Sequence, residues 1–473
     1  MIVSVAISAL LAATKPSSTE LTIYNQGFGF VKEVRSIDLK AGRQTVSVED
    51  VAAQIDPTSV GIRSLTDKSS FQVLEQNYQY DLINPQAILN KSVGQKIRFV
   101  RTLGNSKDVL VGTLMSSPTA IVAGPDGSGQ QTYNGMVIKT DDGRIVLNPT
   151  GEVEVEQVPE GLISKPTLLW DLDASRSGPN SIELSYITHG MSWESNYVLT
   201  LGSDSKADLQ GWVTLNNQSG TGYHDAKLKL LAGDVNQVAQ GFGIGGGGMT
   251  RNAFAAKAAP AFEEQSLFEY HLYTLQRPAT VNNRETKQIS LLEGKDIPIT
   301  RKLVIDSMRG YYNYYPAEGE VGTGDIKPQV RLEFTNDKDS HLGMPLPKGK
   351  IRIYERDKEG SVQLLGEDQI DHTPRNEHLS LVVGRSFDVV SSRKRTNFTR
   401  VNEHVVRESF EIEVRNRKEV PEKVIILERH WGDWKILEKS QDFEKRDAQT
   451  MQFVVALESN ETRKVTYTVE TKY

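Results

Sequence analysis

The glycine-rich stretch at residues 241–248, GFGIGGGG, places Gly241, Gly243 and Gly246 at the G-x-G-x-x-G spacing of dinucleotide-binding loops. Such a loop holds a pyrophosphate when it joins a buried strand directly to the N-terminus of a helix. Here the residues VNQVAQ separate the preceding strand-like run from the glycines, and an alanine-rich stretch broken by a proline follows them. We therefore interpret residues 237–261 as a mobile segment between strands that binds no nucleotide, and we expect the protein to use no cofactor.

The densest set of potential metal ligands is the stretch DHTPRNEH, which contains Asp371, His372, Glu377 and His378. Imidazole and carboxylate groups suit zinc and similar ions. The Thr-Pro pair in the middle of the stretch breaks the regular spacing that would bring the four side chains to one point. We interpret the stretch as a polar hairpin connection and expect no metal site. Another histidine, His430 in RHWGDW, is expected to be a turn residue next to two tryptophans.

Nucleophilic catalysis finds little support in the sequence. There is no G-x-S-x-G and no H-E-x-x-H, and the absence of cysteine excludes thiol nucleophiles, zinc thiolates and disulfides. Ser203 with Lys206 and Ser391 with Lys394 match S-x-x-K, but the companion motifs of that enzyme class are absent. A carboxylate pair able to hydrolyse a glycosidic bond stays open, because 61 acidic residues offer many pairs. We assign no catalytic residue.

The most unusual local feature is the aromatic cluster YYNYYP, with Tyr311, Tyr312, Tyr314 and Tyr315. Tyrosine combines an apolar ring with a polar tip, which suits the binding of a sugar or a protein partner. The proline restricts the residue before it to extended conformations, which favours a strand or a held loop over a helix. Paired strand aromatics that are partly buried are the alternative. We take the four tyrosines as the candidate binding site.

The elements that must position these residues are predicted to be strands. Two-residue alternation of apolar and polar side chains recurs in KIRFVR, FEIEVRNR and RKVTYTVETKY, and long helical periodicity is nearly absent. DDG at 141–143 and DKEG at 357–360 have the composition of hairpin turns. The large rings of Tyr186, Trp193 and Tyr197 are expected to be packing centres of the core. The pattern predicts an all-β chain that contains several β-sandwich or small-barrel domains.

The charge balance argues against a nucleic-acid partner. The net charge is −6 and both signs are interspersed, whereas a general nucleic-acid binder needs a basic surface. Two dense basic clusters, SSRKR at 391–395 and RNRK at 415–418, are interpreted as solvated strand ends.

The N-terminus resembles a signal peptide. An apolar run over residues 2–13 ends in small residues and then turns polar, and it is too short to span a bilayer. Residues 1–14 are therefore predicted to be removed on export, and an N-terminal core strand is the alternative. No run elsewhere in the sequence approaches the length of a transmembrane helix. No Lys or Arg precedes the run.

Composition shifts predict four further regions. They are an N-terminal β unit at 20–84, a small barrel-like insertion at 85–165, a central β domain at 166–324 and a C-terminal β-sandwich at 325–473.

Four long segments, at 183–201, 211–236, 268–292 and 342–368, together carry a resemblance to a known family. The series resembles the exported bacterial family with domain of unknown function 4139, which is distantly similar to mucoidy-inhibitor proteins. The mucoidy-inhibitor branch usually carries a coiled coil where this chain has the small β region, so function is not carried over from that branch. The resemblance implies an exported all-β protein and supplies no catalytic motif.

These observations together predict an exported protein of the bacterial cell envelope, periplasmic or at the surface, that binds a protein or glycan and carries out no chemistry of its own. An envelope hydrolase acting on glycan or peptide is the alternative, and a structural subunit of a surface assembly is a further one.

Overall fold

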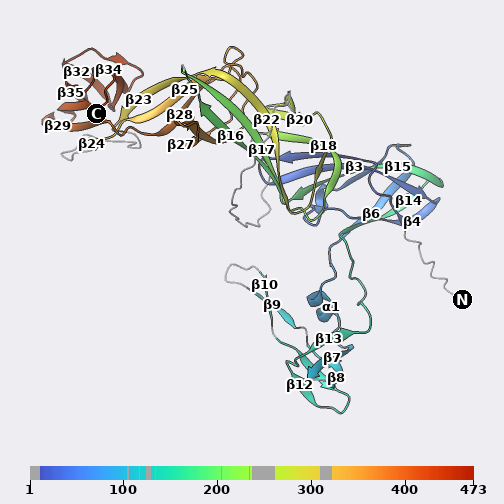
Figure 1. Cartoon of the computed structure of the whole chain (residues 1–473). Coiled ribbons are helices and arrows are strands. Elements are labelled where there is room, and N and C mark those ends of the chain that lie inside the picture. Colours follow the sequence, from blue (N-terminus) through green and yellow to red (C-terminus); the bar gives the residue numbers. More distant parts are fainter. Residues whose placement is uncertain are drawn as a thin grey trace. The chain divides into compact units, whose positions relative to one another are not determined.

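The computed structural model describes residues 11–103, 106–116, 118–123, 129–133, 135–203, 205–233, 235–236, 262–308 and 322–472. Regular structure in these ranges is almost entirely strand, and α1 (Pro85–Lys91) is the one α-helix that they contain (Figure 1). The prediction of an all-β chain with several sheets is therefore confirmed. No helix within the described ranges has the length and apolar character needed to cross a membrane.

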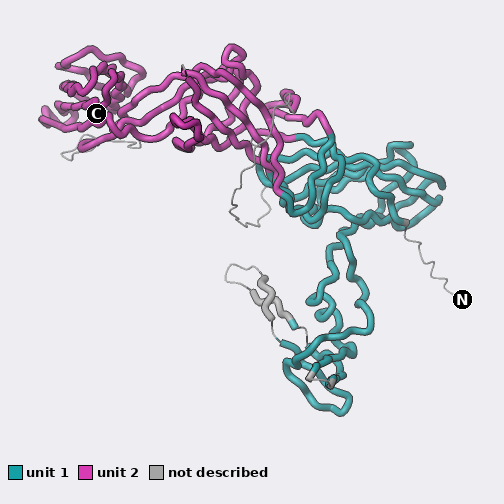
Figure 2. Tube along the Cα trace, viewed as in Figure 1, with its two compact units in different colours: residues 1–192, 216–229, 278–285 teal, residues 193–215, 230–277, 286–473 magenta. Residues whose placement is uncertain are grey.

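The chain divides into two compact units (Figure 2). Unit 1 consists of residues 1–192, 216–229 and 278–285, and unit 2 consists of residues 193–215, 230–277 and 286–473. The four regions expected from the sequence are not tested by this division, and their boundaries stay predictions.

Unit 1 contains two main groups of strands. In the first, β3 pairs with β2 and β15, and β15 pairs with β5. In the second, β14 pairs with β4 and β6, and β1 pairs in parallel with β4. The strands are β1 (Leu11–Ala12), β2 (Ser18–Tyr24), β3 (Phe28–Leu39), β4 (Gly42–Glu49), β5 (Gly61–Ser64), β6 (Phe71–Gln79), β14 (Thr167–Ala174) and β15 (Gly178–His189). Buried residues alternate along β3 and β15, as expected for strands with one face on a core. Residues 1–10 lie outside the described ranges, whereas Leu11 and Ala12, within the predicted signal peptide, pair with β4 as β1. Removal of residues 1–14 stays a prediction.

A five-stranded sheet with its own small core also belongs to unit 1. Its order is β12-β11-β8-β7-β13, and all five strands come from residues 96–155. They are β7 (Lys96–Leu103), β8 (Ser106–Leu114), β11 (Val137–Thr140), β12 (Ile145–Leu147) and β13 (Glu152–Val155). Ile97, Phe99, Leu114 and Ile138 form the buried core, and Leu89 of α1 packs against it. The DDG turn lies between β11 and β12, as predicted.

Unit 2 begins with a sheet of order β22-β17-β16-β26-β27. Its strands are β16 (Met191–Leu201), β17 (Lys206–Asn217), β22 (Glu285–Pro298), β26 (Gly349–Arg356) and β27 (Val362–Ile370). Trp193 and Tyr197 of β16 are buried here, and Tyr186 is buried in unit 1, so the prediction that these rings are packing centres is confirmed. The DKEG turn connects β26 to β27, also as predicted.

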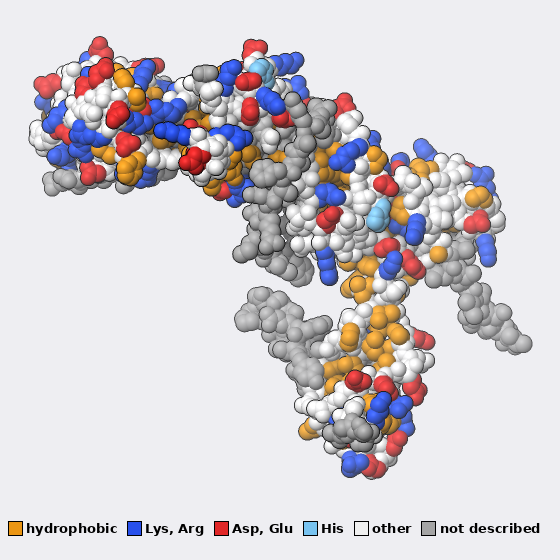
Figure 3. Space-filling view, viewed as in Figure 1, with side chains coloured by type: hydrophobic (Ala, Val, Ile, Leu, Met, Phe, Trp, Pro, Cys, Tyr) orange, Lys and Arg blue, Asp and Glu red, His pale blue; other side chains and the backbone are white. Residues whose placement is uncertain are grey.

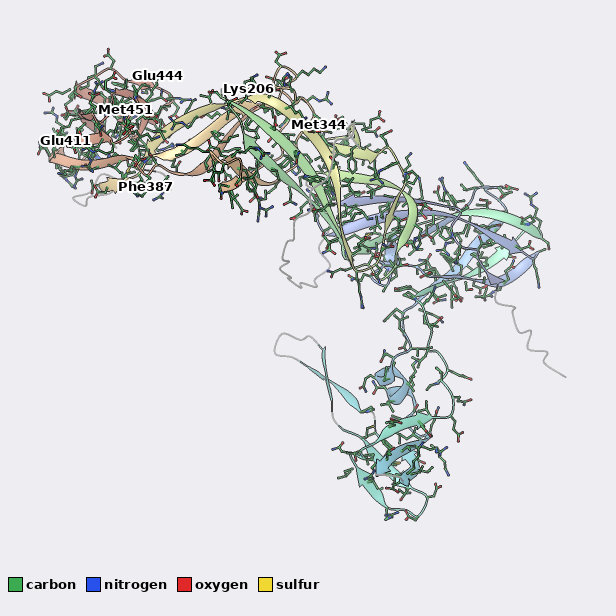
Figure 4. The ribbon with its side chains drawn as sticks, in the orientation of Figure 1. Lys206, Met344, Phe387, Glu411, Glu444 and Met451 are labelled. Carbon is green, nitrogen blue, oxygen red and sulfur yellow. The ribbon has the colours of Figure 1, made fainter. Side chains whose placement is uncertain are left out.

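The C-terminal part of unit 2 is a β-sandwich. One sheet has the order β28-β25-β23-β31-β34-β33 and the other β24-β29-β30-β35-β32. The first contains β23 (Thr300–Asp306), β25 (Gln329–Thr335), β28 (His378–Arg385), β31 (Glu422–Arg429), β33 (Glu444–Lys445) and β34 (Thr450–Leu457). The second contains β24 (Gly324–Ile326), β29 (Val389–Asn402), β30 (Val405–Asn416), β32 (Asp433–Lys439) and β35 (Thr462–Lys472). Both sheets contribute to one core, which includes Val414, Ile426 and Phe453. In Figure 4 the labels Glu411, Glu444 and Met451 mark this sandwich.

The structure corrects the interpretation of SSRKR as a solvated strand end. The segment lies in β29, and Ser391 and Arg393 are buried while Lys394 is exposed. Arg395 is also largely buried and pairs with Glu408 at 3.0 Å. The reason is the two-residue period of a strand, which directs every second side chain into the sandwich. Two buried glutamates, Glu428 and Glu408, pair there with the arginines of the basic run.

The stretch at 371–378 is also not the hairpin connection that we expected. It joins β27 to β28, and these two strands belong to different sheets. The segment therefore crosses between two sheets of unit 2. This crossing brings Pro374 to Asn336 and Arg375 to Glu264.

Candidate functional site

The candidate site is built on the hairpin of β19 (Phe262–Leu267) and β20 (Tyr270–Leu275) in unit 2. Directly opposite residues in an antiparallel pair share a face. The register pairs Glu264 with Tyr273 and Ser266 with His271. Towards the open ends of the two strands this face is apolar, with Phe262, Tyr273 and Leu275 buried, and towards the turn it becomes polar. The switch from apolar to polar places Glu264, Ser266 and His271 at the boundary of the core.

Two loops form the opposite wall. The Tyr273 hydroxyl donates to the carbonyl of Pro345 at 2.9 Å, and the Tyr197 hydroxyl donates to the carbonyl of Pro347 at 2.7 Å. Leu346 and Thr373 exchange two backbone hydrogen bonds, which join this loop to the segment after β27. The two buried tyrosines thus hold the loop at residues 345–347, and Leu346 of this loop holds the segment that follows β27.

Asn336, which is fully buried after β25, holds the same two loops together. Its Nδ2 donates to the carbonyls of Met344 and Pro374, each at 2.9 Å, and its Oδ1 accepts from the backbone N–H of Gly343 at 3.1 Å. Met344 is labelled in Figure 4. One side chain therefore satisfies backbone groups of both loops, which keeps the wall in place.

Between the hairpin and this wall lies an open groove of about 520 Å³. The residues that line it are Glu264, Gln265, Ser266, His271, Pro345, Pro374 and Arg375. Glu264 is its central charge, with a side chain that is only 6% exposed. His271 Nδ1 lies 2.9 Å from one carboxylate oxygen, and Arg375 pairs with the other. A nearly buried carboxylate needs such partners, because burial of an unpaired charge is costly.

The groove offers hydrogen-bond donors and acceptors beside apolar proline surfaces. Arg375 is 55% exposed and His271 38% exposed, so both face solvent while they hold Glu264. A guanidinium has five N–H donors, and those not directed at Glu264 can meet a ligand oxygen. Of the seven residues that line the groove, only Glu264 is a carboxylate. This set suits recognition of hydroxyl, carbonyl or carboxylate oxygens.

An exposed aromatic residue stands at the turn of the same hairpin. Phe268 is 85% exposed, and its backbone has φ of 57°, in the left-handed region that bulky residues rarely adopt. Its ring lies 6.3 Å from that of Tyr270, and Leu267 beside it is also exposed. The hairpin therefore presents apolar side chains at its turn and polar ones in the groove.

The structure does not bring together the residues that the sequence suggested for a metal. Asp371 is 91% exposed and lies 3.6 Å from Lys348, and His372 Nδ1 accepts from the backbone of Lys348. His378 Nε2 lies 3.2 Å from Glu333 instead. No group of three histidine or acidic side chains able to hold a metal ion occurs in the part of the chain that the structure describes.

The other sequence-based candidates fall into two groups. Tyr311, Tyr312, Tyr314 and Tyr315, and the glycine segment 237–261, lie outside the described residues. Ser391, one of the S-x-x-K serines, is buried and donates to the carbonyl of Ile326, so it is no exposed nucleophile.

Sequence reasoning missed Glu264, His271 and Arg375. His271 stands alone between apolar neighbours, and Arg375 is 111 residues away from the Glu264 that it contacts. No spacing rule links such positions. The available signal was two strand-length segments, FEEQSL and YHLYTL, on either side of a two-residue turn, which indicates a hairpin.

Comparisons with known proteins add no family. A scan against protein-family models finds no match, and a search of curated proteins finds none either. The geometry of the groove is therefore the basis for proposing a function.

Proposed function

We propose that the protein is a binding protein of the bacterial cell envelope, exported from the cytoplasm, and that the groove over β19 and β20 receives its partner. The resemblance to an exported family and the signal-like N-terminus support the location. The observation that carries the binding role is the Glu264 cluster, in which His271 and Arg375 contact both oxygens of the one carboxylate that lines the groove.

Binding accounts for this arrangement better than glycoside hydrolysis does. A glycosidase requires two carboxyl groups on either side of the scissile bond. Here the groove supplies one, and both of its oxygens are already engaged. Arg375, Ser266 and the exposed ring of Phe268 can instead contact an extended glycan or peptide without a reaction step.

The test uses purified peptidoglycan and a glycan array as probes. Arg375→Ala removes the exposed guanidinium, and Ser266→Trp fills the groove from an exposed position opposite His271. We expect each to weaken binding at least about tenfold, because a few residues usually supply most of the binding energy. Arg407→Ala is the matched control, since Arg407 is a half-exposed arginine paired with Glu470 on the sandwich. Equal binding by all four proteins would contradict the proposal, as would failure of the wild-type protein to bind any of these probes.

A hydrolase is the second candidate, and one observation favours it. With His271 Nδ1 directed at Glu264, a neutral imidazole leaves Nε2 as an acceptor, and Ser266 lies directly across the hairpin on the same face. In that role Glu264 would orient His271, which would take the proton of Ser266. Release of new amines from peptidoglycan, lost in Ser266→Ala and His271→Gln, would establish this function in place of simple binding.

A further inference from the structure

The C-terminal sandwich buries a charged cluster between its two sheets. Arg393 on β29 and Glu428 on β31 belong to opposite sheets, and their closest nitrogen and oxygen lie 2.8 Å apart. The two side chains are 3% and 0% exposed. The Tyr467 hydroxyl on β35 donates to the same carboxylate at 2.6 Å, and the Arg393 guanidinium lies 3.9 Å from the centre of the Phe410 ring. The pair is thus well satisfied and links the two sheets.

His430, directly after β31, lies beside this pair. It is 6% exposed, so the prediction of a turn residue missed its burial. Its ring centre lies 5.4 Å from that of Trp434, 5.7 Å from Tyr467 and 6.4 Å from Phe410. Its Nε2 is buried, and within the described part of the chain it meets no hydrogen-bond partner. The imidazole therefore occupies a mostly aromatic pocket.

The charged groups around His430 do not favour a second cation. The Glu428 carboxylate attracts a proton to it, but both oxygens of that carboxylate already accept from Arg393. Arg393 is itself a buried cation. Farther away, Arg395 is neutralised by Glu408, and the Lys445 ammonium lies 4.5 Å from the Trp434 ring.

Burial lowers the pKa of His430 to about 4, with a smaller contribution from Arg393 and against the opposing attraction of Glu428. Burial alone would raise the pKa of Glu428, but Arg393 and the hydrogen bonds from Arg393 and Tyr467 bring it below its usual value. Both groups hold protons more weakly in the folded chain than in the unfolded one.

We propose that this cluster is an acid-sensitive lock, in which protonation of His430 as the pH falls below about 5 separates the two sheets where Arg393 and Glu428 join them. The sign follows from linkage. The stabilisation by neutral His430 is complete above the ordinary histidine pKa of about 6.5, and it is lost as the pH falls towards 4.

The cluster also holds the residue just after β23 and the residues just before β24. The Ser307 hydroxyl, just after β23, donates to Glu428 at 3.3 Å, and Arg393 donates to the carbonyl of Gly322, just before β24, at 3.4 Å. The short edge strand β24 pairs with β29 next to Arg393. Opening of the cluster therefore releases β24 first.

The experiment measures denaturant unfolding of the full chain between pH 7 and pH 4 for the wild type, His430→Leu and His404→Leu. His404 is an exposed histidine of the same sandwich and serves as the control. Over this range the unfolding constant of the wild type should rise roughly a hundredfold more than that of His430→Leu, as expected for one proton taken up on unfolding. His404→Leu should follow the wild type.

Two further measurements on the wild type keep the test decisive if His430→Leu does not fold. The His430 ring, followed by NMR, should stay neutral down to about pH 5. Amide exchange at Gly324–Ile326, corrected for its intrinsic rate, should lose protection before the rest of the sandwich. Titration of His430 near 6.5, or parallel pH dependence of the wild type and His430→Leu, would overturn the proposal.

Discussion

Gly349 lies directly across from Ser195 in the parallel pair of β26 and β16, and a Cβ atom built on Gly349 would lie 2.1 Å from the Ser195 carbonyl oxygen. No side chain fits in that space. The pair stands at the entry of β26, just after the loop whose carbonyls accept from Tyr197 and Tyr273. The close approach of these two backbones therefore helps to place the wall of the groove.

Gly349→Ala should destabilise the protein by about 1–3 kcal/mol, because the added methyl group must push two paired strands apart. Gly384→Ala is the control, since a Cβ atom there meets nothing within 4 Å. Urea unfolding of both variants checks the prediction. If Gly349→Ala lost no more stability than Gly384→Ala, β16 and β26 would accommodate the added methyl group without an energetic cost.

Asn336→Ala should cost about 1–3 kcal/mol, because it leaves the carbonyls of Met344 and Pro374 without their side-chain donor. The same variant should weaken ligand binding in the groove, since both loops carry residues that line it. Thermal unfolding and the peptidoglycan assay measure the two effects. Asn397→Ala, at an exposed position of β29, should change neither.

Glu428→Gln should destabilise the sandwich by about 3–5 kcal/mol, because it keeps the shape of the side chain but leaves the buried Arg393 without a counter-charge. Glu411→Gln breaks a comparable but more exposed pair with Lys464 and should cost less than about 1 kcal/mol. The double variant Arg393→Met, Glu428→Met should be less destabilised than Glu428→Gln, since it removes both charges. Calorimetry on the three variants tests this order, and equal losses for Glu428→Gln and Glu411→Gln would refute it.

Alanine at Tyr311, Tyr312, Tyr314 or Tyr315 should weaken partner binding by about 1 kcal/mol or more at each ring that acts as an anchor, with little loss of stability. The binding assay and a melting curve separate the two effects. The reverse pattern, a marked loss of stability with binding unchanged, would show that these rings are part of the core and leave the groove as the sole binding candidate.

The sequence by itself determined the class of fold and many of its local elements. Two-residue alternation is a property of neighbouring residues, so β7, β30 and β35, the turns at 141–143 and 357–360, and the buried rings of Trp193 and Tyr197 were all predictable.

Tertiary structure decided which face each polar residue occupies and which distant residue it meets. SSRKR looked solvated because its sequence is basic, yet Arg393 turns inwards because Glu428 stands on the opposite sheet. In the same way, Glu264 and Arg375 meet only because the segment after β27 crosses between sheets and Asn336 holds it against the loop before β26. Local pattern encodes periodicity, whereas the pairing of charges depends on sheet order, and sheet order is set by the packing of the whole unit.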